Sequence, residues 1–191
     1  MRESRLSRKT NETDIELKIN LDGVGNSDIN TGIAFFDHML NSFAKHGSFD
    51  LTIKARGDIT VDDHHTVEDV GITLGSTILK ALGDKKGITR FADSRIPMDE
   101  ALASVAVDIS GRSFLVFNAK FQNPVIGGLT SINIEHFFES LIANAGINVH
   151  IEATGENDHH KAEAIFKAFG IALKKAVQVI GSGVPSTKGV L

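Results

Sequence analysis

The chain has 191 residues, which is enough for one ordinary domain or for two small halves that share a core. Hydrophobic residues make up 41% and charged residues 23%, and the formal net charge of -4 argues against nucleic acid as a partner. Cysteine is absent, so disulfides and thiolate metal sites are excluded, and no apolar run approaches the length of a membrane span. We therefore expect a cytoplasmic protein that binds neither nucleic acid nor a membrane.

The first half of the sequence predicts strands and amphipathic helices in alternation, after a strand near the N-terminus. DIELKINLDG (14–23) alternates apolar and polar residues and ends at a glycine, as a strand does. FFDHMLNSFAKHGSFDLTIKARG (35–57) predicts a helix, a glycine stop and another strand. DDHHTVEDVGITLG then opens a second helix at residue 62.

The second half repeats this order. ALASVAVDISG (101–111) predicts a strand, residues 113–119 predict another, and NIEHFFESLIANAGINVHIEATG (133–155) again predicts helix, glycine and strand. NDHHKAEAIFKAFG opens the last helix at residue 157.

The two halves align when His64 is paired with His159. Gly75 then meets Gly170, and His38 and His136 each lie 19 residues before a glycine that follows a strand. Apolar residues also coincide at the helical steps of three, four, four and four, in the pairs Val67/Ala162, Val70/Ile165, Leu74/Phe169, Ile78/Leu173 and Leu82/Val177.

This alignment predicts an α+β fold in a single domain made of two repeats, about residues 1–88 and 89–191. Each repeat is expected to be a strand–strand–helix–strand–helix unit with a mostly antiparallel sheet and helices on one face. The helices of the two halves are then expected to pack together around one core.

The repeated Asp-His-His-x-x-Glu blocks predict metal binding. Residues four apart share one face of a helix, so His64 with Glu68, and His159 with Glu163, can each hold an ion, while His65 and His160 point elsewhere. The simplest arrangement is two ions, with each helix contributing to both. Adding His38 and His136 then gives six histidines and two glutamates, which is three imidazoles and one carboxylate per ion. Such ligands suit Mn, Fe, Co, Ni or Zn, and they do not select among these metals. We expect no ligand role for His150, which lies on a predicted strand.

A set of longer motifs indicates a resemblance to one protein family. They are FFDHML, DDHHTVEDVGITLG, MDEALASVAVDISGR, HFFESLIANAG, NDHHKAEAIFKAFG and STKG. With them the chain resembles the imidazoleglycerol-phosphate dehydratase family over essentially its whole length. The resemblance implies a duplicated α+β half-domain, two Mn2+ ions per active site, and 24 subunits with active sites between neighbours. Its metal ligands correspond to His38, His64, His65, Glu68, His136, His159, His160 and Glu163.

The implied reaction is the dehydration of imidazole glycerol phosphate to imidazole acetol phosphate in histidine biosynthesis. Two ions on the ring nitrogens would stabilise an imidazolate, which could expel the hydroxyl and give a diazafulvene-type intermediate. Removal of a proton from the next carbon then gives an enol and finally the ketone. The family implies Glu12 or Asp99 near the substrate as the base, with Glu12 slightly favoured.

The substrate's phosphate requires arginine or lysine side chains or backbone N–H groups. By resemblance, the phosphate-binding candidates are Arg90, Arg112, Lys167, Ser186 and Lys188. His46, which closes the first ligand-bearing helix, is a further substrate-binding candidate, as is Glu12. Lys167 also has an argument of its own, because it follows Glu163 by four residues on one helix face, whereas the repeat has Ile72 at that position. The STKG tail is expected to become ordered over the phosphate.

Three other functions remain open on the sequence alone. A dinuclear metal hydrolase would use its ions to activate water, and phosphate release would distinguish it. A metal-storage protein would bind many ions per chain and would not need the arginines. An RNA-binding module of similar layering is disfavoured by the acidic net charge.

Overall fold

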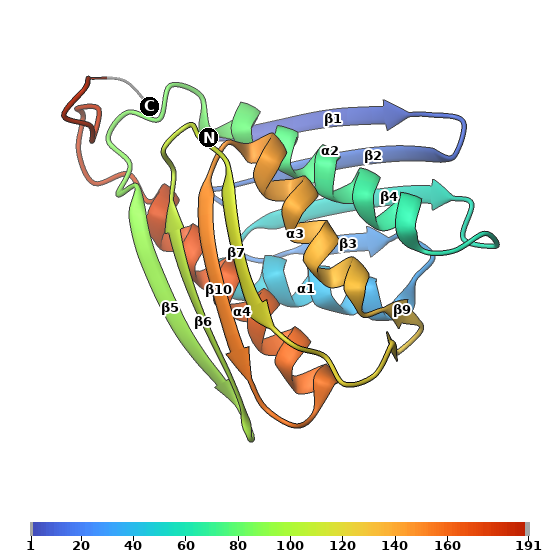
Figure 1. Ribbon diagram of the computed structural model, residues 1–191. Helices are drawn as coiled ribbons and strands as arrows, with labels where there is room; N and C mark the ends of the chain where they lie inside the picture. The colour runs from blue at the N-terminus through green and yellow to red at the C-terminus, as the bar shows by residue number, and fades with distance from the viewer. Residues whose placement is uncertain (1, 190–191) are drawn as a thin grey trace.

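A computed structural model describes residues 2–189 (Figure 1). The first half forms a four-stranded sheet in the order β1-β2-β4-β3, in which β3 pairs parallel to β4 and the other pairs are antiparallel. Its elements are β1 (Glu3–Lys9), β2 (Thr13–Asn20), β3 (Ser27–Asn30), α1 (Ala34–Gly47), β4 (Asp50–Gly57) and α2 (His64–Leu82).

The second half has the same architecture. Its sheet order is β5-β6-β10-β7, and again one pair, β7 with β10, is parallel. Between β7 and the next helix it adds a small hairpin of β8 and β9. The elements are β5 (Phe91–Met98), β6 (Ala101–Asp108), β7 (Phe114–Ala119), β8 (Val125–Ile126), β9 (Leu129–Thr130), α3 (Ile132–Ala145), β10 (Asn148–Thr154) and α4 (Asp158–Val177).

The predicted α+β class and the duplication of the sheet are therefore confirmed, with one correction. Each half places three strands of its four-stranded sheet before its first helix, where the repeat unit was predicted with two. The unpredicted strand in the first half is β3, whose sequence SDIN lies at the sheet edge and is mostly exposed. The boundary near residue 88 falls between α2 and β5, and the assignment of one domain stays a prediction.

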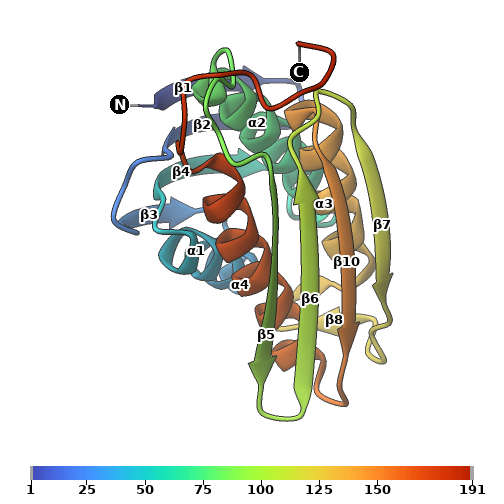
Figure 2. The same ribbon diagram turned by 90° about the vertical axis from the view of Figure 1, so that its left-hand side faces the viewer.

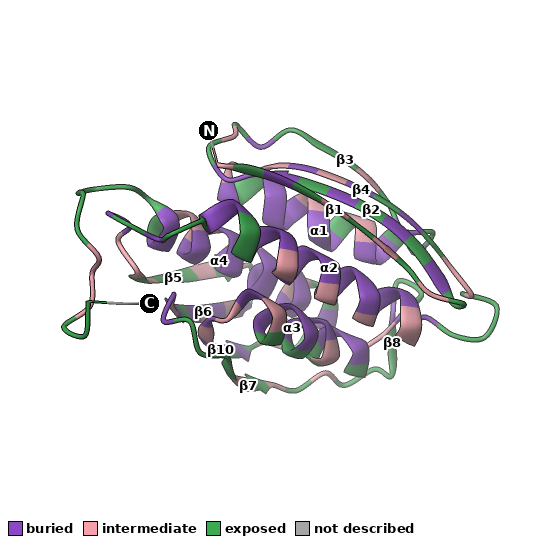
Figure 3. Ribbon diagram, turned by 90° about the horizontal axis from the view of Figure 1, so that it is seen from above, coloured by how far each residue is buried: buried purple, intermediate pink, exposed green. Residues whose placement is uncertain are grey.

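The four helices form a layer between the two sheets (Figures 1 and 2). Each half's helices lie on their own sheet and also pack across the middle, α2 against α3 and α1 against α4. The two predicted apolar stripes on α2 and α4 are fully or almost fully buried, and one hydrophobic core extends through both halves (Figure 3). None of the described helices has the length and apolarity that crossing a membrane requires.

Two glycines at equivalent positions let the helices approach closely across the middle. A side chain at Gly75 of α2 would collide with the Leu141 carbonyl oxygen of α3. One at Gly170 of α4 would place its Cβ 2.6 Å from the Phe43 carbonyl oxygen of α1. Both obstacles are backbone atoms, so the helices themselves would have to separate.

We predict that Gly170→Ala lowers the free energy of unfolding by about 1–3 kcal/mol, because overpacking outweighs the better helix propensity of alanine. The midpoint of urea unfolding measures this. Gly181→Ala is the control, because its added Cβ has no neighbour within 4 Å among the described residues. A midpoint for Gly170→Ala equal to or above that of the unchanged chain would contradict the close packing of α1 and α4.

Candidate metal centre

The four helices each present a histidine near their N-terminal end. His38 and His136 lie in the second turn of α1 and α3, and His64 and His159 lie in the first turn of α2 and α4. The start of α4 is fixed by Asn157, whose side chain accepts hydrogen bonds from the backbone N–H groups of His159 and His160. The apolar stripes bury the helix bodies, and this leaves the histidine-bearing ends at the rim of the helix layer.

The first group of potential metal ligands, which we call the Glu163 cluster, consists of His38, His159 and Glu163. The Nε2 atoms of His38 and His159 lie 3.1 and 3.2 Å from Glu163 Oε2. Burial raises the pKa of Glu163, but hydrogen bonds from Lys167 and His38 outweigh burial and lower that pKa to about 2. The carboxylate is therefore ionised and ready to bind a cation at neutral pH.

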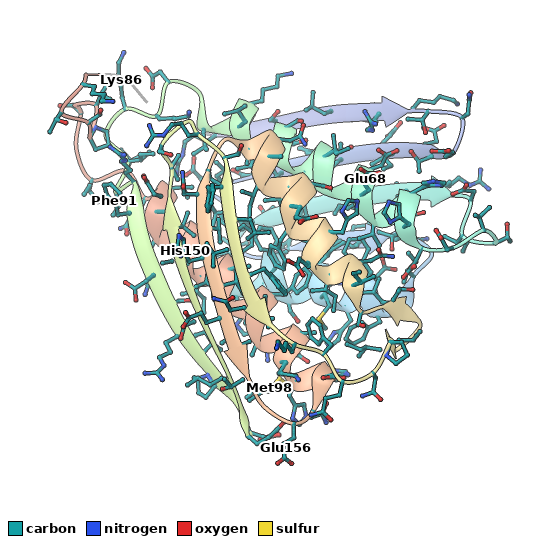
Figure 4. All side chains as sticks on the ribbon, viewed as in Figure 1. Glu68, Lys86, Phe91, Met98, His150 and Glu156 are labelled. Carbon is teal, nitrogen blue, oxygen red and sulfur yellow. The ribbon has the colours of Figure 1, made fainter. Side chains whose placement is uncertain are left out.

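The second group, the Glu68 cluster, consists of His64, Glu68 and His136. Glu68 Oε2 lies 3.9 Å from His64 Nε2, and Glu68 Oε1 lies 3.5 Å from His136 Nε2. The two imidazole rings stack with their centroids 4.5 Å apart. Nε2 of His136 is buried and has no hydrogen-bond partner, which leaves an imidazole nitrogen aimed at the carboxylate and unsatisfied. Figure 4 marks Glu68 on α2.

The residues in both clusters fit a divalent metal ion. In each cluster the three potential ligand atoms lie within 4.8 Å of one another. Bonds of about 2.0–2.2 Å from a central ion to imidazole nitrogen and carboxylate oxygen are compatible with that spacing. An ion would also supply the missing partner of His136 Nε2. The pairing of His64 with Glu68 and of His159 with Glu163, expected from helical spacing, is what the geometry displays.

The second histidine of each block stands outside these clusters, as the divergence of adjacent helical residues predicts. Nδ1 of His65 lies 3.0 Å from an Asp58 carboxylate oxygen, and Nδ1 of His160 lies 2.9 Å from Glu100. The Asp58 carboxylate raises the pKa of His65, and Glu100 raises that of His160. A carboxylate at Nδ1 fixes the proton there and leaves Nε2 as the atom available to a metal.

The aspartate that begins each block holds the loop beside the cluster. Asp63 accepts hydrogen bonds from the Thr130 backbone and from the Asn133 side chain. Asp158 accepts them from the backbone N–H groups of Gln122 and Asn123. Sequence reasoning gave these aspartates no role, although their place before both His-His pairs was a usable signal.

Both candidate bases lie in hairpins at equivalent places in the two halves. Glu12 is in the β1–β2 turn, and its Oε1 is 3.8 Å from His65 Nε2. Asp99 is in the β5–β6 turn, and its Oδ2 is 3.8 Å from His160 Nε2. The fold thus brings each acid beside the second histidine of its own half. The alignment of the two halves had not paired Glu12 with Asp99.

The phosphate candidates fall into two groups. Lys167 is close to the candidate metal centre, with its Nζ 2.8 Å from Glu163 Oε1. Burial lowers the pKa of His46, and the positive charge of nearby Lys167 lowers it further. Arg90 is remote, because its backbone N–H bonds to the Ala176 carbonyl near the other end of α4. The thirteen residues of helix from Glu163 to Ala176 span about 20 Å.

The remaining phosphate candidates lie near Arg90. The Arg90 guanidinium pairs with Asp108 at 2.7 Å and donates a hydrogen bond to the Pro185 carbonyl, one residue before Ser186. Exposed Arg112 lines a hollow with Asp108, and Lys188 is exposed in the tail. Phe91, next to Arg90, and Glu156, just before α4, mark these opposite ends in Figure 4. One chain therefore does not bring Arg90, Arg112, Ser186 or Lys188 to its own clusters.

Comparison with known proteins decides the family. Residues 31–173 match the family model described as imidazoleglycerol-phosphate dehydratase. The chain belongs to the imidazoleglycerol-phosphate dehydratase family. As a member it is an enzyme of the hydro-lyase class.

Relatives and solved structures agree with this assignment. The imidazoleglycerol-phosphate dehydratase of Methanococcoides burtonii is 57% identical and that of Methanosarcina barkeri 58%, each over the full length of both chains. The crystal structure of the Staphylococcus aureus dehydratase has a TM-score of 0.83 at 40% identity, covering 94% of this chain and 99% of that one. The Pyrococcus furiosus enzyme in complex with (S)-C348 gives 0.84 at 36%, covering 97% and 100%.

Proposed function

We propose that this chain catalyses the dehydration of imidazole glycerol phosphate to imidazole acetol phosphate, a step of histidine biosynthesis, in the cytoplasm. The observation that carries the proposal is the pair of matching clusters, each with two imidazoles and one carboxylate, in a chain of this dehydratase family. A substrate with a two-nitrogen ring is a natural ligand for a site with two metal ions. The resident ions we propose are two Mn2+ per active site.

The ligand residues would be the three of the Glu163 cluster and the three of the Glu68 cluster, together with His65 and His160. When bound, the two ions would supply Lewis-acid stabilisation of negative charge on the substrate ring. Asp58 and Glu100 hold the Nδ1 protons of His65 and His160, so that each Nε2 is presented as a ligand. The ionised Glu163 contributes the negative charge that a cation needs.

The remaining chemistry is the loss of the hydroxyl and a proton transfer. The hydroxyl leaves from the carbon beside the ring, which gives a diazafulvene-type intermediate. The Glu12 carboxylate then takes the proton from the next carbon, and the resulting enol becomes the ketone. Asp99 is the alternative base, since it occupies the equivalent place in the second half.

We predict that Glu12→Gln lowers turnover by about a hundredfold or more, the usual contribution of a general base, while both metal ions stay bound. The amide keeps the size of the side chain but cannot accept the proton. Steady-state rates and metal analysis of the same preparation measure the two effects. Asp99→Asn is the matched variant, because it also replaces a carboxylate by an amide of the same size. Near-normal turnover in Glu12→Gln with loss in Asp99→Asn would transfer the role to Asp99.

The active site we propose is built between subunits of a 24-subunit assembly. Three observations support it. Each cluster takes only three ligands from one chain, His65 and His160 stand apart with Nε2 available, and Arg90 lies about 20 Å of helix away from Glu163. A neighbouring chain would then supply Arg90, Arg112, Ser186 and Lys188 to the phosphate, with His46 and Lys167 near the metal end.

Chelation tests the proposal directly. Enzyme stripped by a chelator should lose the formation of ketone from imidazole glycerol phosphate, and added Mn2+ should restore it. Full activity after complete removal of metal would overturn the metal-dependent mechanism. Release of inorganic phosphate without ketone would instead indicate a dinuclear hydrolase, whose ions activate water.

A further inference from the structure

The two metal clusters have the same three ligand types but different surroundings. In the Glu163 cluster, the ammonium group of Lys167 contacts Glu163 Oε1 at 2.8 Å, while Glu163 Oε2 faces the two histidines. One carboxylate oxygen is thus taken by a cation before any metal ion arrives. The Lys167 side chain is largely buried, which limits the screening of its charge by water.

The Glu68 cluster has no such competitor. Position 72, equivalent to Lys167, is an isoleucine, and within residues 2–189 no Lys or Arg side chain forms an ion pair with Glu68. Its two oxygens face the two histidines of the cluster, one each. Glu68 can therefore offer its whole charge to an ion.

A second difference acts in the same direction. Nδ1 of His136 lies 3.1 Å from Glu139 Oε2, and a carboxylate at this place makes the other ring nitrogen a stronger metal ligand. The equivalent residue beside His38 is Asn41, which is neutral and donates its amide hydrogen to the Asp37 carbonyl instead. The Glu68 cluster thus has an additional negative charge beside it, from Glu139, and the Glu163 cluster has an additional positive charge, from Lys167.

We propose that Lys167 and Glu139 make the two clusters unequal, so that the Glu68 cluster takes its metal ion first and the Glu163 cluster takes its ion second and more weakly. Lys167 acts here as a positioning residue, since it restricts Glu163 to one free oxygen and places a positive charge beside the ion. The inference rests on the proposed metal site and adds an order of filling to it. At limiting metal, the enzyme is half-loaded at a defined cluster.

Mn2+ titration of the metal-free full-length protein tests the inference, with free Mn2+ followed by electron paramagnetic resonance. Two stepwise dissociation constants are expected, separated by about tenfold or more, the scale of changes around metal ligands. Glu163→Gln should remove the weaker constant and Glu68→Gln the tighter one. Two equal constants, or removal in the opposite order, would overturn the proposal.

Substitutions at the equivalent positions 167 and 72 provide a matched pair. Lys167→Met should tighten the weaker constant about tenfold and leave the other unchanged, while Lys167→Arg should keep the original difference. Ile72→Lys should weaken the tighter constant by creating the same contact at Glu68. Lys80 is exposed on α2, and Lys80→Met removes the same single positive charge as Lys167→Met. It should alter neither constant.

The outcomes separate this inference from the proposed function. No Mn2+ binding by folded protein would overturn the metal site itself. Two bound ions whose constants do not respond to Lys167→Met would leave the metal site in place and overturn the role of Lys167 in making the clusters unequal. If Ile72→Lys fails to fold, Lys167→Met against Lys167→Arg decides alone, because both keep the native residue at 72.

Discussion

Replacing His159 by alanine is expected to lower turnover by about a thousandfold or more and to remove the ion of the Glu163 cluster. The Nε2 atom of His159 is 3.2 Å from Glu163 and is one of the three potential ligand atoms of the Glu163 cluster. A bound metal ion contributes several kcal/mol of charge stabilisation, and each 1.4 kcal/mol is tenfold in rate. The side chain is 45% exposed, so its removal leaves no core cavity.

The comparison for this variant is His150→Ala, which changes another histidine of the same chain. His150 lies on β10 on the exposed face of the sheet, apart from both clusters. Turnover on imidazole glycerol phosphate, metal content and unfolding midpoint should be measured for both variants. A folded His159→Ala protein that keeps both ions and normal turnover would exclude His159 as a ligand.

Replacing Asp158 by alanine is expected to lower the free energy of unfolding by about 3–5 kcal/mol, the cost of leaving one member of a buried ion pair alone. Asp158 and Lys161 are both 3% exposed, and their charged atoms lie 2.8 Å apart. The carboxylate also holds Gln122 and Asn123 of the loop before β8. Urea unfolding followed by circular dichroism measures the loss.

The same carboxylate gives a pH dependence of known sign. Burial raises the pKa of Asp158, but the hydrogen bonds from Lys161, Asn123 and Gln122 prevail and lower it to about 2, from 3.8 in the unfolded chain. Because the folded pKa is the lower one, its stabilisation is fully present above about pH 4 and is lost as the pH falls towards 2. The stability difference between the native chain and Asp158→Asn should shrink over that window.

Asp84→Ala is the control, since Asp84 pairs with Lys86 on an exposed turn. It should leave the unfolding midpoint unchanged, as most exposed ion pairs do. An Asp158→Ala midpoint equal to that of Asp84→Ala would mean that the Asp158–Lys161 pair does not stabilise the fold.

The features that the sequence predicted best are the helices whose apolar residues are buried. The stripes from Val67 to Leu82 and from Ala162 to Val177 are readable because each helix is covered on two sides, by its own sheet and by a helix of the other half. Edge strands carry a weaker signal. β3 reads SDIN and is mostly exposed, so no alternation of apolar residues marks it.

At the candidate metal centre, helical spacing predicted which histidine lies beside which glutamate. It could not predict Asp58 and Glu100 as partners of the second histidines, because these acids sit in a loop and a hairpin that only the tertiary fold brings near. The same holds for Glu163 and Lys167: the spacing of four predicted a shared face, and the ion pair between them emerges from the structure.

The crossed packing of the helices also has a consequence for the origin of the chain. In each half, the side of the helices that faces away from the sheet is covered by helices of the other half, α2 by α3 and α1 by α4. An isolated half would leave that apolar surface in water, where it favours association. A half-length ancestor would therefore have existed as a homodimer, and gene duplication with fusion would have joined two copies already paired in this way.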